Sequence, residues 1–105
     1  MTKVKFLFNG ESIIGYEITG HSSENCDDIE GKVVCSAVSS AAYMAANTVI
    51  EIIGDKCEVD VKDAKMFFKV NCPSPETVAV LKGFRFHITE LSKQYGNRIR
   101  IITEV

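Results

Sequence analysis

Two residues in the first part of the sequence, His21 and Cys35, are of the types that together cleave acyl bonds. A cysteine attacks a carbonyl carbon through its thiolate, and a neighbouring imidazole accepts the thiol proton and later returns it to a leaving amine. These types therefore predict nucleophilic chemistry at a peptide bond. Their spacing is permissive rather than specific, because a loop between them can bring the two side chains together or hold them apart.

The candidate nucleophile lies near the start of a predicted helix. Apolar residues recur at intervals of three and four from Val33 to Ile53, which indicates one long helix, and Gly54 supplies its C-terminal stop. Cys35 is then expected in the first turn, where unpaired amides and the positive end of the helix dipole favour the thiolate. The same amides are expected to hold the oxyanion of a tetrahedral intermediate.

A polar, acidic segment runs between the two residues, from Gly20 to Gly31. Its composition predicts an exposed, mobile loop, with His21 at the end of the preceding strand. We expect this loop to order over a bound substrate, as active-site lids do. The residues that we assign to this lid are Ser22, Asp27, Asp28 and Gly31.

Two segments of alternating apolar and polar residues flank Asn9 and Gly10 and predict a hairpin. A one-residue slip in register would turn one apolar set to the opposite face of the sheet. We therefore expect an odd loop, with Phe6 opposite Ile14 or Ser12, and with Gly10 in the left-handed conformation of a bulge.

The rest of the chain adds two strands, a helix and a last strand. Residues 57–61 and 66–70 alternate, Ser74-Pro75 has the form of an N-cap followed by a first-turn proline, and residues 98–105 form the last strand. The order ββαββαβ predicts a single α+β domain over residues 1–105. We expect a two-layer sandwich in which two helices cover a mixed or antiparallel sheet.

Composition argues against several classes of function. The formal net charge is −2 and no basic run occurs, which argues against nucleic acid as the main ligand. No uninterrupted run of about 18 apolar residues is present, so no membrane-spanning helix is expected. The N-terminus also lacks the pattern of a signal peptide. We therefore expect a cytoplasmic protein that binds no membrane and whose thiols are reduced.

Three further cysteines, Cys26, Cys57 and Cys72, accompany Cys35. None of the four forms a Cys-x-x-Cys pair, which removes the commonest zinc and redox spacings, so no metal or cofactor is expected. Cys57 alternates with valines and is predicted to be a core thiol. Two roles remain possible for Cys26 from the sequence: a regulatory disulfide with Cys35, or a metal site with Cys35 and His21.

The residues around the candidate pair carry a family resemblance. Gly20-His21-Ser22, an acidic loop, and then Gly31-Lys32-Val33-Val34-Cys35-Ser36-Ala37-Val38-Ser39 resemble the ribosomal-processing cysteine proteases called Prp. The family pattern is Gly-His-small, a loop with a glycine, an apolar pair, Cys, two small residues, an apolar or small residue, and Ser. The resemblance extends over essentially the whole chain, because length and element order also match. It implies that His21 and Cys35 are the catalytic pair.

The resemblance also implies a substrate and an assembly. The family removes a short N-terminal extension from ribosomal large-subunit protein twenty-seven, after an apolar sequence that contains Phe, and its members form homodimers. We therefore expect the precursor of a ribosomal protein as the substrate and a homodimer as the assembly. Ser39, one helical turn beyond Cys35, and the small Ser36 are candidates for binding the substrate carbonyl or the oxyanion.

One departure from the family pattern concerns a carboxylate. Many members have Asp three residues before the cysteine, and this sequence has Lys32 there. A carboxylate can orient a catalytic histidine, and Asp27 and Asp28 are the candidates here. The other interpretation is a dyad that works without a third group, with the lysine helping to lower the pKa of the thiol.

Two other functions are consistent with the residues alone. A non-enzymatic, ribosome-associated binding module would tolerate replacement of Cys35 by Ser or Ala. A metal-binding or redox-responsive thiol protein would bind zinc in stoichiometric amount or form a reversible bond between Cys26 and Cys35.

Overall fold

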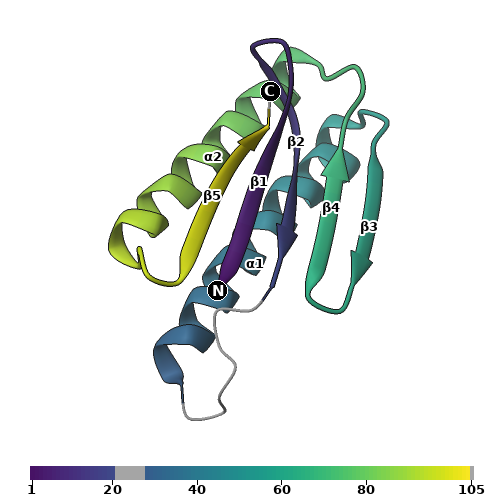
Figure 1. The fold of residues 1–105 in the computed structure, drawn as a ribbon. Helices are drawn as coiled ribbons and strands as arrows, with labels where there is room; N and C mark the ends of the chain where they lie inside the picture. Colours follow the sequence, from purple (N-terminus) through teal and green to yellow (C-terminus); the bar gives the residue numbers. More distant parts are fainter. Residues whose placement is uncertain (21–27, 105) are drawn as a thin grey trace.

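Five strands form one mixed sheet in the computed structural model, which describes residues 1–20 and 28–104 (Figure 1). The strand order is β3-β4-β2-β1-β5, with β1 and β5 parallel and every other neighbouring pair antiparallel. The predicted α+β class, the mixed sheet and the order ββαββαβ are thus confirmed. The strands are β1 (Thr2–Asn9), β2 (Ser12–Thr19), β3 (Glu58–Lys62), β4 (Lys65–Lys69) and β5 (Ile99–Glu104).

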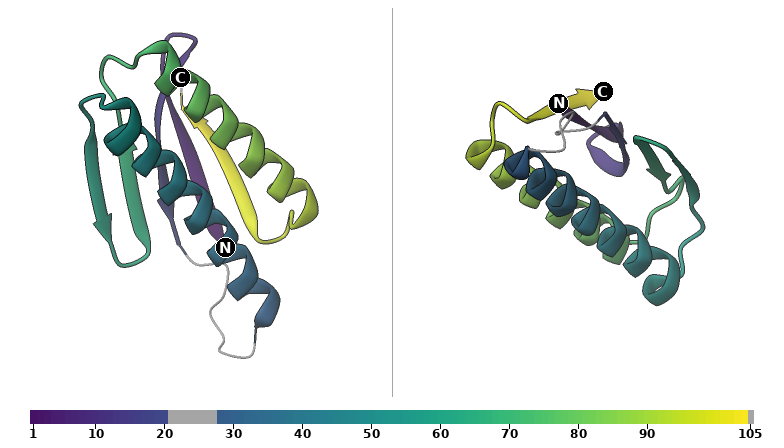
Figure 2. Two further views of the ribbon diagram at one scale, coloured as in Figure 1. Left: turned by 180° about the vertical axis from the view of Figure 1, so that it is seen from behind. Right: turned by 90° about the horizontal axis from the view of Figure 1, so that it is seen from below.

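The helices cover one face of this sheet and make the second layer (Figure 2). Helix α1 (Ile29–Asn47) continues directly into a π-helical segment, η1 (Thr48–Ile53), and α2 is Pro75–Gln94. Gly54 ends η1 in the left-handed conformation, with φ +85°, as predicted. The predicted cap of the last helix is also confirmed, because the side chain of Ser74 accepts a hydrogen bond from a first-turn amide.

The first helix starts four residues before Val33, the first helical residue that the sequence predicted. It begins at Ile29, and Asp28 is its N-cap, with Oδ1 accepting a hydrogen bond of 3.0 Å from the amide of Gly31. Asp28 and Gly31 therefore belong to the helix start and not to a mobile loop. The prediction was wrong because an acidic N-cap followed by an apolar and an acidic residue was interpreted as the end of a polar loop.

The apolar residues of β1 and β2 lie on one face of the sheet because the pair contains a β-bulge. The loop between the strands does not have the odd number of residues that the sequence predicted. A two-residue turn joins Asn9 to Ser12, and a register shift follows farther along the pair, so that Phe6 lies opposite Tyr16. The predicted pairing of Phe6 with Ile14 or Ser12 was therefore wrong. Gly10 has φ +64°, the predicted left-handed conformation. Phe6 and Tyr16 are both fully buried, as the single apolar face requires.

Tyr16 joins the sheet to the first helix. Its ring packs on Phe84 of α2, with 4.3 Å between the ring centroids, and on Phe68 of β4, at 5.4 Å. Its hydroxyl donates a buried hydrogen bond of 2.6 Å to the carbonyl of Ala42. Burial of this hydroxyl raises the pKa of Tyr16. The contacts of one side chain thus fix the position of α1 over the sheet.

The continuous helical segment Ile29–Ile53 is long and apolar enough to cross a membrane by length and composition alone. Core helices of globular domains pass the same test. Its buried face, which includes Val34, Val38 and Val49, packs in the hydrophobic core, so this segment serves as a core helix of the sandwich.

Candidate active site

A cavity lies between α1 and the edge of the sheet where β2 ends and the β3–β4 hairpin turns. Its volume is about 160 Å³. Its walls are mostly apolar side chains with hydroxyls and amines at intervals. The lining residues are Thr2, Ile18, Gly20, Cys35, Val38, Ser39, Tyr43, Val61, Lys62, Ala64, Lys65 and Met66.

Cys35 is half-buried on the helical wall of this cavity. Ser39 and Tyr43 follow at intervals of four residues, which places them on the same face of α1. Ser39 therefore lines the same cavity as Cys35, and its role in binding substrate stays a prediction. Ser36 is exposed and does not line the cavity, so the structure does not place it at the candidate site.

Cys35 lies deeper in α1 than the sequence predicted, which changes the expected source of its reactivity. Because α1 begins at Ile29, Cys35 is six residues beyond the first helical residue, or about 9 Å along the axis at 1.5 Å per residue. Its amide lies inside the helix and is not one of the unpaired groups at the N-terminus. The helix dipole acts mainly within the first turn, so neither thiolate stabilisation nor an oxyanion hole can come from the helix start.

The other side of the cavity carries the residue that precedes His21. Gly20 has φ +83°, and its amide donates a hydrogen bond of 3.0 Å to the carbonyl of Ala64 in the β3–β4 turn. A Cβ at this position would lie 2.5 Å from the carbonyl oxygen of Met1. Positive φ and close backbone packing both require glycine here. The described chain thus reaches the cavity wall one residue before His21.

Several predicted site residues fall outside the described part of the chain. These are the candidate base, the candidate regulatory thiol, the candidate third group and one lid residue: His21, Cys26, Asp27 and Ser22. Their assignments stay predictions.

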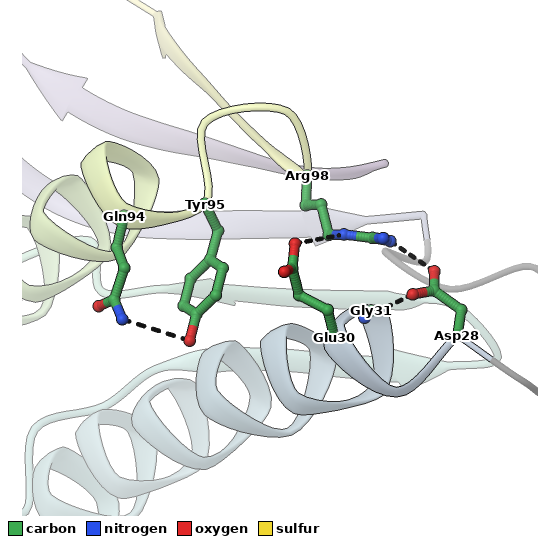
Figure 3. A network of polar contacts seen from close by, with 6 residues as sticks. All are labelled: Asp28, Glu30, Gly31, Gln94, Tyr95 and Arg98. Carbon is green, nitrogen blue, oxygen red and sulfur yellow. Dashed lines mark hydrogen bonds and ion pairs between the residues drawn. The ribbon is translucent and has the colours of Figure 1, made fainter.

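A polar cluster fixes the point at which the chain enters α1 (Figure 3). Arg98, just before β5, donates hydrogen bonds to Oδ2 of Asp28 and, at 3.0 Å, to Oε1 of Glu30. The amide of Gly31 and then the guanidinium of Arg98 hold the pKa of Asp28 below its ordinary value. Each carboxylate oxygen of Asp28 thus accepts a hydrogen bond, one from Gly31 and one from Arg98. Asp28, which the sequence offered as a carboxylate to orient His21, therefore caps and anchors the start of α1.

The other described thiols lie away from this site. Cys57 is half-buried and packs against the core, as predicted, and burial, followed by the charge of Asp55, raises its pKa. Cys72 is exposed. Both line a separate hollow and not the cavity of Cys35. In residues 1–20 and 28–104, no group of three His, Cys, Asp or Glu side chains is placed to hold a metal ion.

Sequence reasoning missed the residues that the sheet contributes to the site. Thr2, Lys62 and Lys65 line the cavity because β1 and the β3–β4 hairpin lie beside β2. No local pattern indicates such a meeting of distant segments. The position of Tyr43 was predictable from the sequence, because it follows Cys35 and Ser39 at the same four-residue interval and therefore lies on the same face of the helix.

The sequence model of the family described as Cysteine protease Prp matches residues 1–100. The chain belongs to this family. It is therefore a cysteine peptidase, and the resemblance found in the sequence is confirmed. Against curated proteins, no significant match was found.

Solved structures agree with the Prp assignment at the level of the fold. The ribosomal processing protease Prp from S. aureus, in complex with a substrate peptide, superposes with a TM-score of 0.88 at 14% identity, covering 99% of this chain and 100% of that chain. The same protease with a covalently linked product peptide gives 0.86 at 15% identity, with the same coverage. SMU.848 from Streptococcus mutans gives 0.77 at 18% identity, covering 99% and 96%. These identities are low, so they show a shared fold.

Proposed function

We propose that this Prp-family peptidase cleaves its substrate with Cys35 as the nucleophile and His21 as the base. We further propose that the substrate is the precursor of ribosomal large-subunit protein twenty-seven, that cleavage removes its N-terminal extension, and that the enzyme acts as a cytoplasmic homodimer. The observation that carries the catalytic pair is the shared cavity, because Cys35 and Gly20 both line it and His21 follows Gly20 directly.

The reaction follows from the chemistry of the two groups. The imidazole of His21 takes the thiol proton, and the thiolate of Cys35 attacks the scissile carbonyl carbon to give a tetrahedral intermediate. The carbon–nitrogen bond then breaks, and the imidazolium protonates the departing amine. Water attacks the resulting thioester, which releases the carboxylic acid and regenerates the thiol.

Side-chain donors on the cavity wall replace the helix-start amides in this scheme. The hydroxyl of Ser39 lies one turn from Cys35 on the same wall of the cavity. We propose that it donates a hydrogen bond to the substrate carbonyl as negative charge develops on the oxygen. The apolar floor, which includes Ile18, Val38 and Met66, suits an apolar substrate side chain.

The relatives support the choice of substrate. The S. aureus protease is described as an essential ribosomal processing protease, and it has been crystallised with a substrate peptide and with a covalently linked product peptide. The cavity beside Cys35 is consistent with a peptide substrate for this chain as well. Light scattering of the purified protein tests the homodimer separately, because a monomeric mass would exclude it.

The test is cleavage of a synthetic peptide that spans an extended ribosomal-protein N-terminus. Wild type is expected to cut one bond after an apolar residue, and Cys35→Ala and His21→Ala are expected to lose this activity. Cys72→Ala and His87→Ala are matched controls, because both residues are exposed and neither lines the cavity. Equal cleavage by Cys35→Ala would show that the nucleophile is wrong. Binding without cleavage by wild type would favour a binding module.

A further inference from the structure

The cavity of Cys35 continues well beyond the thiol. Figure 2 shows α1 crossing the strands obliquely, from the N-terminal end of β1 toward β4 and β3. The helical wall of the cavity accordingly runs from Cys35 through Ser39 to Tyr43. The opposite wall runs across four strands, from Thr2 to Val61. The end of the cavity that Tyr43 and Val61 form is distant from the reacting sulfur.

The rise of α1 gives the distance along the helical wall. Tyr43 is eight residues beyond Cys35 on α1, which is about 12 Å along the axis at 1.5 Å per residue. The opposite wall has a similar length, because three strand spacings separate β1 from β3, which is about 14 Å at 4.7–4.9 Å per spacing. An extended peptide advances about 3.3–3.6 Å per residue. A peptide that crosses the site therefore places its third or fourth residue from the scissile bond beside Tyr43 and Val61.

The chemistry of this far end is apolar with a basic edge. Tyr43 is 45% exposed and Val61 is 49% exposed, which leaves two apolar surfaces open on either side of the cavity. Val61 lies opposite the buried Met66 in the hairpin, and Lys62 lies opposite Lys65 at its tip. Both lysines line the cavity, so a basic substrate side chain would meet charge of the same sign.

We propose that Tyr43 and Val61 form a specificity subsite for one apolar side chain of the substrate, three or four residues from the scissile bond. This inference rests on the proposed function, because it takes the bond attacked by Cys35 as the origin. The two exposed surfaces are separated from solvent only when a side chain lies between them. Burial of that side chain supplies the binding free energy.

The test uses a set of peptides with one cleavage site, in which the third and fourth residues on each side of the scissile bond are changed singly from Leu to Ala, and to Lys. With wild type, one of these positions is expected to show a loss in kcat/KM of about tenfold when Leu is replaced by Ala, because apolar pockets discriminate between side chains by about this factor. Replacement by Lys at the same position is expected to cause a larger loss. Tyr43→Ala is expected to cleave the Leu and Ala peptides at equal rates. Phe86→Ala is the matched control, since Phe86 is 68% exposed on α2 and does not line the cavity.

The same peptides are also measured for equilibrium binding to Cys35→Ala and to Cys35→Ala/Tyr43→Ala, which separates this inference from the proposed function. Discrimination between Leu and Ala in the first protein and its loss in the second support the subsite even if the wild type cuts nothing. Three results overturn it. The first is no discrimination at any of the four positions, either in cleavage by an active wild type or in binding to Cys35→Ala. The second is discrimination that Tyr43→Ala leaves unchanged. The third is an equal loss for all peptides in Tyr43→Ala, which indicates a structural role.

Discussion

Cys35 and Gly20 line the same cavity from opposite sides, one on α1 and the other at the end of β2. The amide of Gly20 is fixed to the β3–β4 turn, and Tyr16 fixes α1 to the sheet. Rigid elements therefore hold both ends of the segment that joins the proposed base to the proposed nucleophile, since Arg98 also anchors the start of α1. A peptidase needs such anchoring because small displacements of reacting groups reduce the rate strongly.

Gly20→Ala tests the anchor beside His21, and Gly10→Ala is its matched control. Both glycines have positive φ, but a Cβ at Gly10 meets no atom within 4 Å, whereas one at Gly20 would lie 2.5 Å from the carbonyl oxygen of Met1. Gly10→Ala is expected to cost about 1–2 kcal/mol of stability from φ alone and to keep its activity. Gly20→Ala is expected to lose tenfold or more in kcat as well. Urea unfolding and peptide cleavage measure the two effects, and equal activities of the variants would contradict the anchor.

Asp28→Asn tests the charge at the helix start through the dependence of stability on pH. The pKa of Asp28 lies below its ordinary value of 3.8, because its carboxylate accepts hydrogen bonds from Gly31 and Arg98. The ionised carboxylate therefore stabilises the fold fully above the ordinary pKa, and this contribution is lost as pH falls through the lower, folded-state pKa. The melting temperature of wild type is expected to exceed that of Asp28→Asn above about pH 5, and the difference is expected to shrink below pH 4.

The control for this prediction is the same substitution in an Arg98→Met background. Because Arg98 is one of the two partners of Asp28, the effect of Asp28→Asn is expected to become smaller there. An effect of the same size in both backgrounds, at every pH, would show that the ion pair does not stabilise the helix start.

Tyr16→Phe tests the contact that sets α1 over the sheet. The buried hydroxyl of Tyr16 donates to the carbonyl of Ala42 at 2.6 Å, so its removal is expected to cost about 1 kcal/mol of unfolding free energy. For a domain of this size, that corresponds to a fall in melting temperature of about 4–8 °C. Tyr95→Phe is the control. Among residues 1–20 and 28–104, the hydrogen-bond partner of its hydroxyl is the exposed side chain of Gln94, so a change within about 0.5 kcal/mol is expected. Equal effects of the two substitutions would contradict the role of Tyr16.

The order of the elements was predictable because each one has a local pattern. The alternation in β1 and β2, the Ser74-Pro75 start of α2 and the glycine after η1 indicate strands, a cap and a stop. The hairpin register was not predictable, because a bulge in β2 satisfies the same burial pattern as an odd loop. The start of α1 was misplaced because its stabilisation comes from Arg98, which is distant in sequence.

The geometry of the candidate site was predictable only in part. The common position of Cys35 and Ser39 on one face of α1 was predictable, because their four-residue interval is a local feature. The wall that contains Lys62 and Lys65 depends on the pairing of β2 with β4, which no single segment specifies. The explanation for the reactivity of the thiol failed for a related reason, because four more residues at the start of α1 move the dipole end away from Cys35.

The central claim is that Cys35 is the nucleophile and that His21 activates it. The most direct measurement is covalent trapping with a peptide chloromethyl ketone, whose chloride a thiolate displaces to form a thioether, followed by peptide mapping. We predict one adduct per chain, located on Cys35, which is absent in Cys35→Ala and forms much more slowly in His21→Ala at neutral pH. Cys57 and Cys72 serve as internal references for the rate of an ordinary thiol. Labelling of Cys35 no faster than Cys72, or at the same rate with and without His21, would contradict the account.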